Sequence, residues 1–515
     1  RHRQEWDPIQ SNRVLMNRVV LLTLLILLGF SSVPRARAAT ADEWASRTIY
    51  QLLTDRFATA SPAAPCSNLH HYCGGSFQGV VDHLDYIQSM GFDAIWISPI
   101  PVNTENGYHG YWALDLEKVN PYFGTEEDLL ALVEACHARD MYVMLDVVMN
   151  HMGNLGSDYS EAVPFNSSEY YHDCTSCPAS CNIEEYVCFN GQIEQCRLSG
   201  LPDLNQSHPQ VGSYLIEWAR NTVAQFGFDG LRLDTVPEVS REFWSDFQQQ
   251  VGVYTVGEVW SDLNCTAAFQ EVLDGVLSYP MCFTIRDCFQ GPTAATTSSS
   301  SGGSGELAPL TELADQQAAL SQSMRNVSLL GTFVDNHDNA RFLNMTSVPL
   351  YRYQSALAYV LLSSGIPIVY YGTEQALHGG DDPNNRESLW TTGYSQEALL
   401  YQWLANVIAF RKTNQVWLYP HEPLLVDDSF YAFARGNAIV CLTNANTAFV
   451  TRTLSADKRF TDGTRLCDPT SFAPHCVVVE NGQFQCDVLD GSPTLFAPVA
   501  AAAASSYSSY INHWK

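Results

Sequence analysis

Polar and ionisable side chains recur at the ends of short apolar runs along much of this 515-residue chain. Asp234, Glu258 and Asp338 each close one such run, and His151 closes another. Carboxylates on separate runs suggest cleavage of a glycosidic bond, because that reaction needs one group to protonate the leaving oxygen and a second to attack or stabilise the oxocarbenium-like centre. The alternative is a set of salt bridges that only stabilises the fold, but recurrence at four run ends favours chemistry.

The residue types around Asp234 suggest a role for it. Arg232 precedes Asp234 by two residues, so both side chains point to the same face of a β-strand. A guanidinium beside a carboxylate lowers the carboxylate pKa and keeps the group ionised, as a nucleophile requires. A general acid needs a raised pKa, which a second carboxylate nearby can supply.

Apolar runs alternate with helix-like stretches between about residues 40 and 410. The runs at 142–150, 228–236 and 253–259 are short and almost continuously apolar, which is typical of parallel strands buried on both faces. The repeated order of strand and helix implies a βα-barrel or an open doubly wound sheet. In a barrel the carboxyl ends of the strands meet at one face, where active sites are built.

Composition changes divide the chain. Residues 152–204 hold five cysteines and little periodicity, so we expect a small inserted domain stapled by disulfides. Residues 291–305 are of low complexity and predict a flexible loop. After about residue 413, short alternating runs predict an antiparallel β-domain. The expected parts are upstream residues and signal peptide at 1–38, a catalytic barrel at 40–151 and 205–412, the inserted domain at 152–204, the β-domain at 413–499 and a tail at 500–515.

The amino-terminal residues have the pattern of a secretory signal. Met16 is the predicted start, an apolar run spans 19–30, and an A-x-A pattern predicts cleavage near Ala38. Fifteen cysteines and N-x-S/T sequons fit the same extracellular route. Cys136, in a helix-like stretch, is predicted to be a buried free thiol. The C-x-x-C at 174–177 could bind zinc, but disulfides are favoured in a secreted protein.

Charge excludes some partners. The chain carries 55 acidic and 27 basic residues, for a formal charge of −28. Such a balance argues against binding nucleic acid or anionic membranes and suits a soluble protein that acts on a neutral polymer. We expect a monomer.

Four ordered segments resemble the signatures of the α-amylase family of glycoside hydrolases. They are DVVMNH (146–151), GLRLDTV (230–236), GEV (257–259) and FVDNHD (333–338). The resemblance extends over about 44–412 and is strongest to secreted fungal-type α-amylases. It implies an α/β fold: a (β/α)8 TIM barrel with a small inserted domain after the third strand and a C-terminal antiparallel β-sandwich. It also implies retaining cleavage of α-1,4-glucans.

The resemblance assigns roles to individual residues. Asp234 matches the nucleophile, Glu258 the acid/base, and Asp338 the carboxylate that distorts the sugar and stabilises the transition state. The residues that match substrate-binding positions are Arg232, His151, His337, Tyr111, Trp112, His109, His70, Asp382 and Arg386.

A structural Ca²⁺ between barrel and insert is a further implication. Its matching ligands are the side chains of Asn150, Glu194 and Asp203 and the backbone carbonyl of Glu238, and oxygen ligands suit this hard cation. The resemblance also implies disulfides Cys181–Cys196 and Cys66–Cys73.

The sequence departs from the family pattern after the nucleophile. Pro237 and Glu238 stand where a Lys-His pair contacts the leaving side of the substrate, so hydrogen-bond donors at subsites +1 and +2 are lost. Cys265 lacks its family partner, for which Cys282 or Cys288 could substitute. The departures keep a 4-α-glucanotransferase open as an alternative to endo-hydrolysis, with an inactive glucan-binding protein as a third hypothesis.

Overall fold

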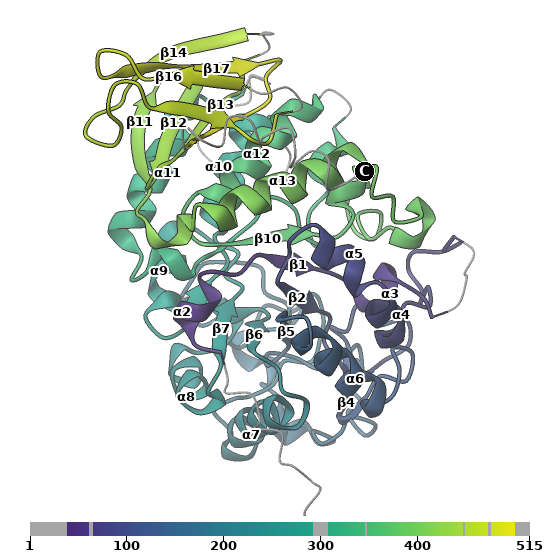
Figure 1. The fold of residues 1–515 in the computed structure, drawn as a ribbon. Coiled ribbons are helices and arrows are strands. Elements are labelled where there is room, and N and C mark those ends of the chain that lie inside the picture. The colour runs from purple at the N-terminus through teal and green to yellow at the C-terminus, as the bar shows by residue number, and fades with distance from the viewer. Residues whose placement is uncertain are drawn as a thin grey trace, which may run out of the picture. The chain divides into compact units, whose positions relative to one another are not determined.

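Eight short parallel strands form one barrel, with helices around it (Figure 1). The sheet order is β8-β7-β6-β5-β2-β1-β10-β9, and a parallel bridge between Leu277 and Gly331 joins its two ends. The closed order confirms the predicted (β/α)8 barrel and excludes the open sheet. The strands are β1 (Ile49–Gln51), β2 (Ala94–Ile97), β5 (Tyr142–Val147), β6 (Gly230–Leu233), β7 (Tyr254–Gly257), β8 (Gly275–Val276), β9 (Gly331–Thr332) and β10 (Ile366–Tyr370).

The computed structural model describes residues 39–60, 65–291, 307–345, 348–445, 449–471 and 475–499. The predicted signal peptide, nearly all of the low-complexity loop and the predicted tail lie outside these residues. Within them, no helix is both long and apolar enough to cross a membrane.

Alternation along the strands builds two apolar layers. Ala94, Trp96 and Met144 belong to one buried cluster, whereas Ile95 and Val143 belong to another. Because successive side chains on a strand point to opposite faces, the first cluster fills the barrel and the second faces the helices. Strands buried on both faces explain the continuous apolar runs in the sequence.

Local capping signals mark the ends of some of the helices. Thr125 caps α6 through a capping box with Asp128, and Gly227 ends α7 in the left-handed conformation that glycine adopts readily. The helices are α2 (Ala41–Trp44), α3 (Thr54–Phe57), α4 (Phe77–Asp82), α5 (Leu84–Ser89), α6 (Glu126–His137), α7 (Pro209–Phe226), α8 (Arg241–Val251), α9 (Leu263–Gln270), α10 (Tyr279–Phe289), α11 (Leu310–Ser323), α12 (Leu350–Leu362) and α13 (Leu399–Thr413).

The insert after the third barrel strand is irregular, as expected. Its described helical structure is limited to two short 3₁₀ turns, Ser168–Tyr170 and Cys174–Ser176. A small apolar cluster of Ile183, Ile193 and Cys196 is its own core. Phe165 and Tyr171 pack into the main core cluster, and disulfides within the insert add crosslinks to this packing.

The cysteine pairing differs from the expectation. Cys66–Cys73 is present, and Cys136 is a buried free thiol, as predicted. The predicted Cys181–Cys196 pair is wrong, because Cys181 bonds Cys174, seven residues away, and Cys196 bonds Cys177. Both cysteines of the C-x-x-C motif are thereby used in disulfides, which rules out the zinc alternative.

The predicted partners of Cys265 are also wrong. Cys188 of the insert bonds Cys265 of α9, which fastens the insert to the barrel, and Cys282 and Cys288 are buried free thiols.

The carboxy-terminal strands are antiparallel, as predicted. One sheet has the order β11-β12-β13-β18-β15-β16, and β14 pairs with β17 in a second. Asn444, at the end of β13, donates to the carbonyl oxygens of Cys288 at 3.1 Å and Ala308 at 2.9 Å, which joins this region to the barrel helices. The strands are β11 (Glu422–Val426), β12 (Phe430–Arg435), β13 (Ala438–Thr443), β14 (Phe449–Ser455), β15 (Arg465–Asp468), β16 (His475–Val478), β17 (Gln483–Leu489) and β18 (Thr494–Pro498).

Candidate active site

Arg232 organises a cluster of carboxylates at the carboxyl end of the barrel. Its Nη1 lies 2.6 Å from Oδ1 of Asp234 and 2.9 Å from Oδ1 of Asp146, and its Nη2 lies 2.9 Å from Oε2 of Glu258. Asp146 and Arg232 are direct partners in the register of β5 and β6. One guanidinium therefore brings together groups from three neighbouring strands.

Burial controls the protonation of this cluster. It raises the pKa of Asp234 to about 6 and the pKa of Glu258 to about 7, while the charge of Arg232 lowers both. The expectation that Arg232 lowers the pKa of Asp234 is right for that contact but wrong for the net change, because desolvation is the larger effect. Burial therefore makes both carboxyls hold a proton at a higher pH than they would in water.

Asp338 lies next to the same cluster, and its charge raises the pKa of both Asp234 and Glu258. Its Oδ2 is 3.3 Å from Nε2 of His337, and its Oδ1 is 3.5 Å from Nη2 of Arg386. The Asp338 side chain is 28% exposed, against 8% for Asp234. Asp338 is therefore the carboxylate more open to a ligand.

Aromatic and imidazole rings cover one side of the carboxylates. The rings of Tyr111 and His337 stack with centroids 5.2 Å apart and planes 1° apart, and the Tyr111 hydroxyl donates to Oδ2 of Asp146 at 2.6 Å. His109 packs edge-on against Trp112 at 4.7 Å. These positions follow from a hairpin of β3 (Pro101–Asn103) and β4 (Ala113–Val119) that the sequence analysis did not predict.

The buried histidines are neutral. Burial lowers the pKa of His151 to about 4 and the pKa of His337 well below its usual value. Nε2 of His151 lies 3.1 Å from the carbonyl oxygen of Tyr111, and Nδ1 of His337 lies 2.8 Å from Nε2 of Gln51. The two rings therefore add no positive charge beside the carboxylates.

Sequence reasoning missed a group of residues behind Glu258. The Tyr279 hydroxyl donates to Oε1 of Glu258 at 3.2 Å and accepts from Nδ2 of Asn336 at 3.0 Å. Trp260, 46% exposed, stacks on Tyr279 with centroids 5.0 Å apart. Tyr279 follows β8, so the rule of polar residues after strands could have found it, but this strand has only two residues.

Oxygen atoms converge where the calcium ligands were predicted. Oδ1 of Asn150 faces Oδ1 of Asp203 at 3.1 Å and the carbonyl oxygen of Glu238 at 3.2 Å. Oxygens this close repel unless a cation lies among them or the amide is turned, so the group fits a hard cation. Glu194 is half-buried, and burial raises its pKa. The charge of His172 lowers that pKa, and Nδ1 of His172 also bonds Oδ2 of Asp203, so Glu194 lies near the same group of oxygens. In the described part of the chain, no three His, Cys, Asp or Glu side chains form a metal cluster.

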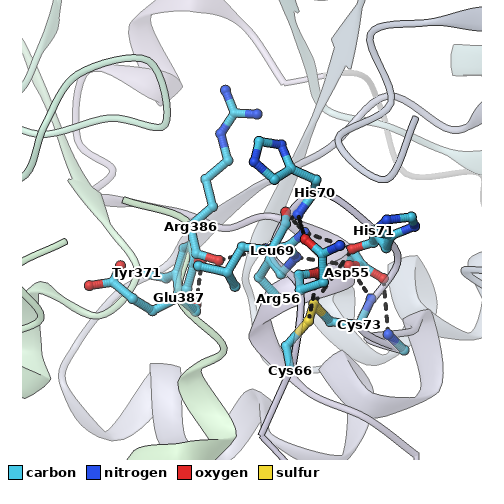
Figure 2. Close-up of a disulfide and its surroundings, with 12 residues drawn as sticks. Asp55, Arg56, Cys66, Leu69, His70, His71, Cys73, Tyr371, Arg386 and Glu387 are labelled. Atoms are coloured by element: carbon cyan, nitrogen blue, oxygen red, sulfur yellow. Dashed lines mark hydrogen bonds and ion pairs between the residues drawn. A yellow bond between two sulfur atoms is a disulfide. The ribbon is translucent and has the colours of Figure 1, made fainter. Parts of the chain in front are cut away.

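The remaining predicted residues border the site on two loops. Asp382 and Arg386 form an ion pair at 3.0 Å. His70 is exposed and lies on the loop closed by Cys66–Cys73, and Figure 2 shows its ring beside the Arg386 side chain. The structure thus brings these two loops, which are far apart in the sequence, to one border of the site.

Together, the barrel and this site define a class, that of barrel enzymes equipped for glycoside hydrolysis. The α-amylase catalytic-domain family matches residues 51–419. An alpha-amylase of Saccharomycopsis fibuligera is 37% identical over 490 residues, which cover 91% of this chain and 94% of that protein. The structure of an alpha-amylase from Malbranchea cinnamomea is 38% identical, with a TM-score of 0.81, over 91% of this chain and 99% of that one.

An alpha-amylase from Geobacillus thermoleovorans, solved in complex with acarbose, is 28% identical, with a TM-score of 0.76, over 89% of this chain and 99% of that one. The protein belongs to the α-amylase family of glycoside hydrolases, and the fungal relatives support an α-amylase function for it.

Proposed function

We propose that the protein is a secreted, retaining α-amylase that hydrolyses internal α-1,4-glucosidic bonds of starch and related glucans. The observation that carries this proposal is the double ion pair of Arg232 with Asp234 and Glu258, at 2.6 and 2.9 Å. Two carboxylates on adjacent nitrogens of one guanidinium are near neighbours, which suits the separation of about 5 Å in retaining rather than inverting enzymes.

Each carboxylate has a distinct task in this proposal. Asp234, ion-paired and ionised, attacks the anomeric carbon, while Glu258 gives its proton to the leaving glycosidic oxygen. Water then attacks the same anomeric carbon while Glu258 takes its proton, so the bond to Asp234 breaks and the sugar leaves with a new hydroxyl. Asp338, more exposed and next to Arg386, binds hydroxyls of the distorted sugar.

The neutral residues around the carboxylates suit a glucan. Tyr111 offers an aromatic face at the sugar that is cleaved, with Trp112 and His109 alongside, and His151 and His337 bind its hydroxyls. An acarbose complex of a 28% identical relative supports a ligand of this chemical class. We propose no role for nucleic acid or membranes, and we propose that the protein acts as a monomer.

Calcium is part of the proposal. Asn150, Asp203 and the Glu238 carbonyl would hold the ion, with Glu194 completing the site. When bound, Ca²⁺ would supply charge that fastens the insert to the barrel, and it takes no part in bond cleavage. The domain bounds given above, the signal peptide and secretion belong to the same proposal, supported by the disulfides and the secretion-type sequence pattern.

Product analysis on maltoheptaose tests the proposal. The purified protein should produce shorter oligosaccharides with a matching rise in reducing ends, and Asp234→Asn should produce neither. Longer oligosaccharides without new reducing ends would identify a transferase instead. No change with the wild-type protein would reject both activities and leave a glucan-binding protein.

A 4-α-glucanotransferase remains the second candidate because of one local feature. Glu238 follows the nucleophile segment, is only 8% exposed, and its Oε2 has no hydrogen-bond partner among the described residues. A carboxyl in place of the family's donors changes how an acceptor is held, whether the acceptor is water or a sugar. The ratio of transfer to hydrolysis in Glu238→Gln against wild type measures that effect.

A further inference from the structure

Arg56 lies beneath two loops that border the proposed substrate site. Its side chain is 0% exposed. Nη1 donates to the carbonyl oxygen of Arg386 at 2.8 Å, and Nη2 donates to the carbonyl oxygens of Leu69 at 2.7 Å and His71 at 3.0 Å (Figure 2). One guanidinium therefore bonds the backbone of Arg386 and the residues on both sides of His70.

Asp55 fastens the same loop from a second direction. Its Oδ2 accepts from Nε of Arg56 at 2.8 Å and from the backbone N–H of Cys73 at 2.8 Å, and its Oδ1 accepts from the N–H of Gly74 at 3.1 Å. Cys73 in turn closes the loop through its disulfide to Cys66. The disulfide and the Asp55–Arg56 pair thus act on one segment.

Tyr108 connects the arrangement to the residues that face the sugar. The Arg56 guanidinium lies 3.8 Å from the centre of the Tyr108 ring, and the Tyr108 hydroxyl accepts from Nη1 of Arg386 at 3.2 Å. The same Arg386 nitrogen pairs with Asp382 at 3.0 Å. Arg56 therefore holds the backbone of Arg386 directly and its side chain through Tyr108.

We propose that Arg56 is a positioning residue that sets Arg386 and His70 together, so that the Cys66–Cys73 loop and the loop after β10 bind substrate as one unit. The inference rests on the proposed function, because it takes Arg386 and His70 as substrate-binding residues. It predicts a larger effect on substrate binding than on bond cleavage, since Arg56 contacts the binding loops directly and reaches Asp338 only through Arg386.

A buried arginine could also serve folding alone, and a matched control separates the two roles. Arg411 is likewise 0% exposed and donates to backbone carbonyl oxygens, at 2.9 Å to Leu361 and 3.3 Å to Ala45, away from the site. Arg411→Lys should lower the melting temperature and leave KM and kcat for maltoheptaose unchanged.

Steady-state kinetics of Arg56→Lys on maltoheptaose test the inference in the full chain. A lysine cannot span three carbonyl oxygens, so KM should rise about tenfold, the effect of one lost charged hydrogen bond, while kcat changes less than KM. A KM within about twofold of wild type, or equal proportional changes in KM and kcat, would overturn the proposal. If Arg56→Lys does not fold, Asp55→Asn replaces it with the same two outcomes.

A double-mutant cycle with Cys66→Ser/Cys73→Ser makes the test sharper. The disulfide and Arg56 hold the same loop, so the loop should keep part of its order when only one of them is removed. The fold increase in KM of the combined variant should therefore exceed the product of the fold increases of the two separate variants. Simple multiplication of the two effects would contradict a shared loop. Wild-type hydrolysis of maltoheptaose is measured alongside, because its absence refutes the proposed function and not the positioning role.

Discussion

The barrel mouth and the insert at 152–204 hold their polar groups in different ways. At the mouth, Arg232 joins Asp146, Asp234 and Glu258, and the strands beneath are buried on both faces. In the insert, described regular structure is sparse, and disulfides and the oxygen atoms near Asp203 take its place.

The contrast shows where each region obtains its order. Apolar packing stabilises the barrel without help from its charged residues, so those residues are available for chemistry. The separate apolar cluster of the insert is small, so we expect its order to depend more on crosslinks and on the proposed ion. Changes at the mouth should therefore alter rates, and changes in the insert should alter stability.

The largest expected effect comes from Asp234→Asn. Loss of the proposed nucleophile should lower kcat on the order of 10⁴-fold, the scale for removing one member of a catalytic unit. Arg232 keeps its ion pairs with Asp146 and Glu258, so the melting temperature should change little. Activity assays and calorimetry measure both, with exposed Asp85→Asn as the control. Retained activity would refute the nucleophile, and a large loss of stability would refute the contrast.

Disulfide removal should affect the insert and the carboxy-terminal sheets differently. Cys177→Ser/Cys196→Ser opens a loop with a sequence separation of 19 residues, which corresponds to about 3 kcal/mol of stability. Cys441→Ser/Cys486→Ser, with a separation of 45 residues, should cost a similar amount. Only removal of the Cys177–Cys196 disulfide should also weaken Ca²⁺ binding, which titration calorimetry measures. Equal Ca²⁺ affinity in both variants would show that the insert disulfide does not support the proposed ion site.

Calcium removal should give a smaller change. At a free concentration 100 times its dissociation constant, a bound ion stabilises a protein by about 2.7 kcal/mol, so a chelator should lower the melting temperature by about 3 °C in a protein of this size. Asp203→Asn should abolish that response. If the chelator leaves the melting temperature unchanged, no ion is bound, and the Asn150 amide is instead turned and hydrogen-bonded to its neighbours.

The barrel strands could be predicted from sequence because each strand is marked by residues that are close together in the chain. Runs such as 228–236 are apolar, short and end in polar residues, and each of these signals lies within about ten residues. Closure of the barrel required the family resemblance, since a doubly wound sheet produces the same runs. Asp146, which the sequence places at a strand end, gains its importance only from its register with Arg232.

What could not be predicted depends on the path of the chain between elements. The partners of Cys181 and Cys265 are set by turns in the insert that have no periodic pattern. Tyr279 was missed because two residues are too few to show a strand. The net pKa of Asp234 required knowledge of burial, because the sequence shows the adjacent Arg232 charge but not the larger desolvation.

The smallest expected effect concerns the pH dependence of activity and tests whether the contacts of Glu258 at the carboxyl end of the barrel set its pKa. Glu258 must be protonated to act as an acid, so kcat/KM should fall above about pH 7, the raised pKa of Glu258, and should fall again as Asp234 protonates below about pH 6. The Tyr279 hydroxyl donates to Glu258 and thereby favours its ionised form. Tyr279→Phe should remove that preference and move the alkaline limb upward by about half a pH unit to one unit.

Tyr254→Phe is the matched control for this pH profile. Tyr254 is also buried, but its hydroxyl donates to the carbonyl oxygen of Leu329 at 2.7 Å instead of to a carboxylate. Its removal should cost stability and leave both limbs in place. A downward shift of the alkaline limb in Tyr279→Phe, or equal shifts in the two variants, would mean that packing around the barrel and not the hydrogen bond to Glu258 sets the acid's pKa.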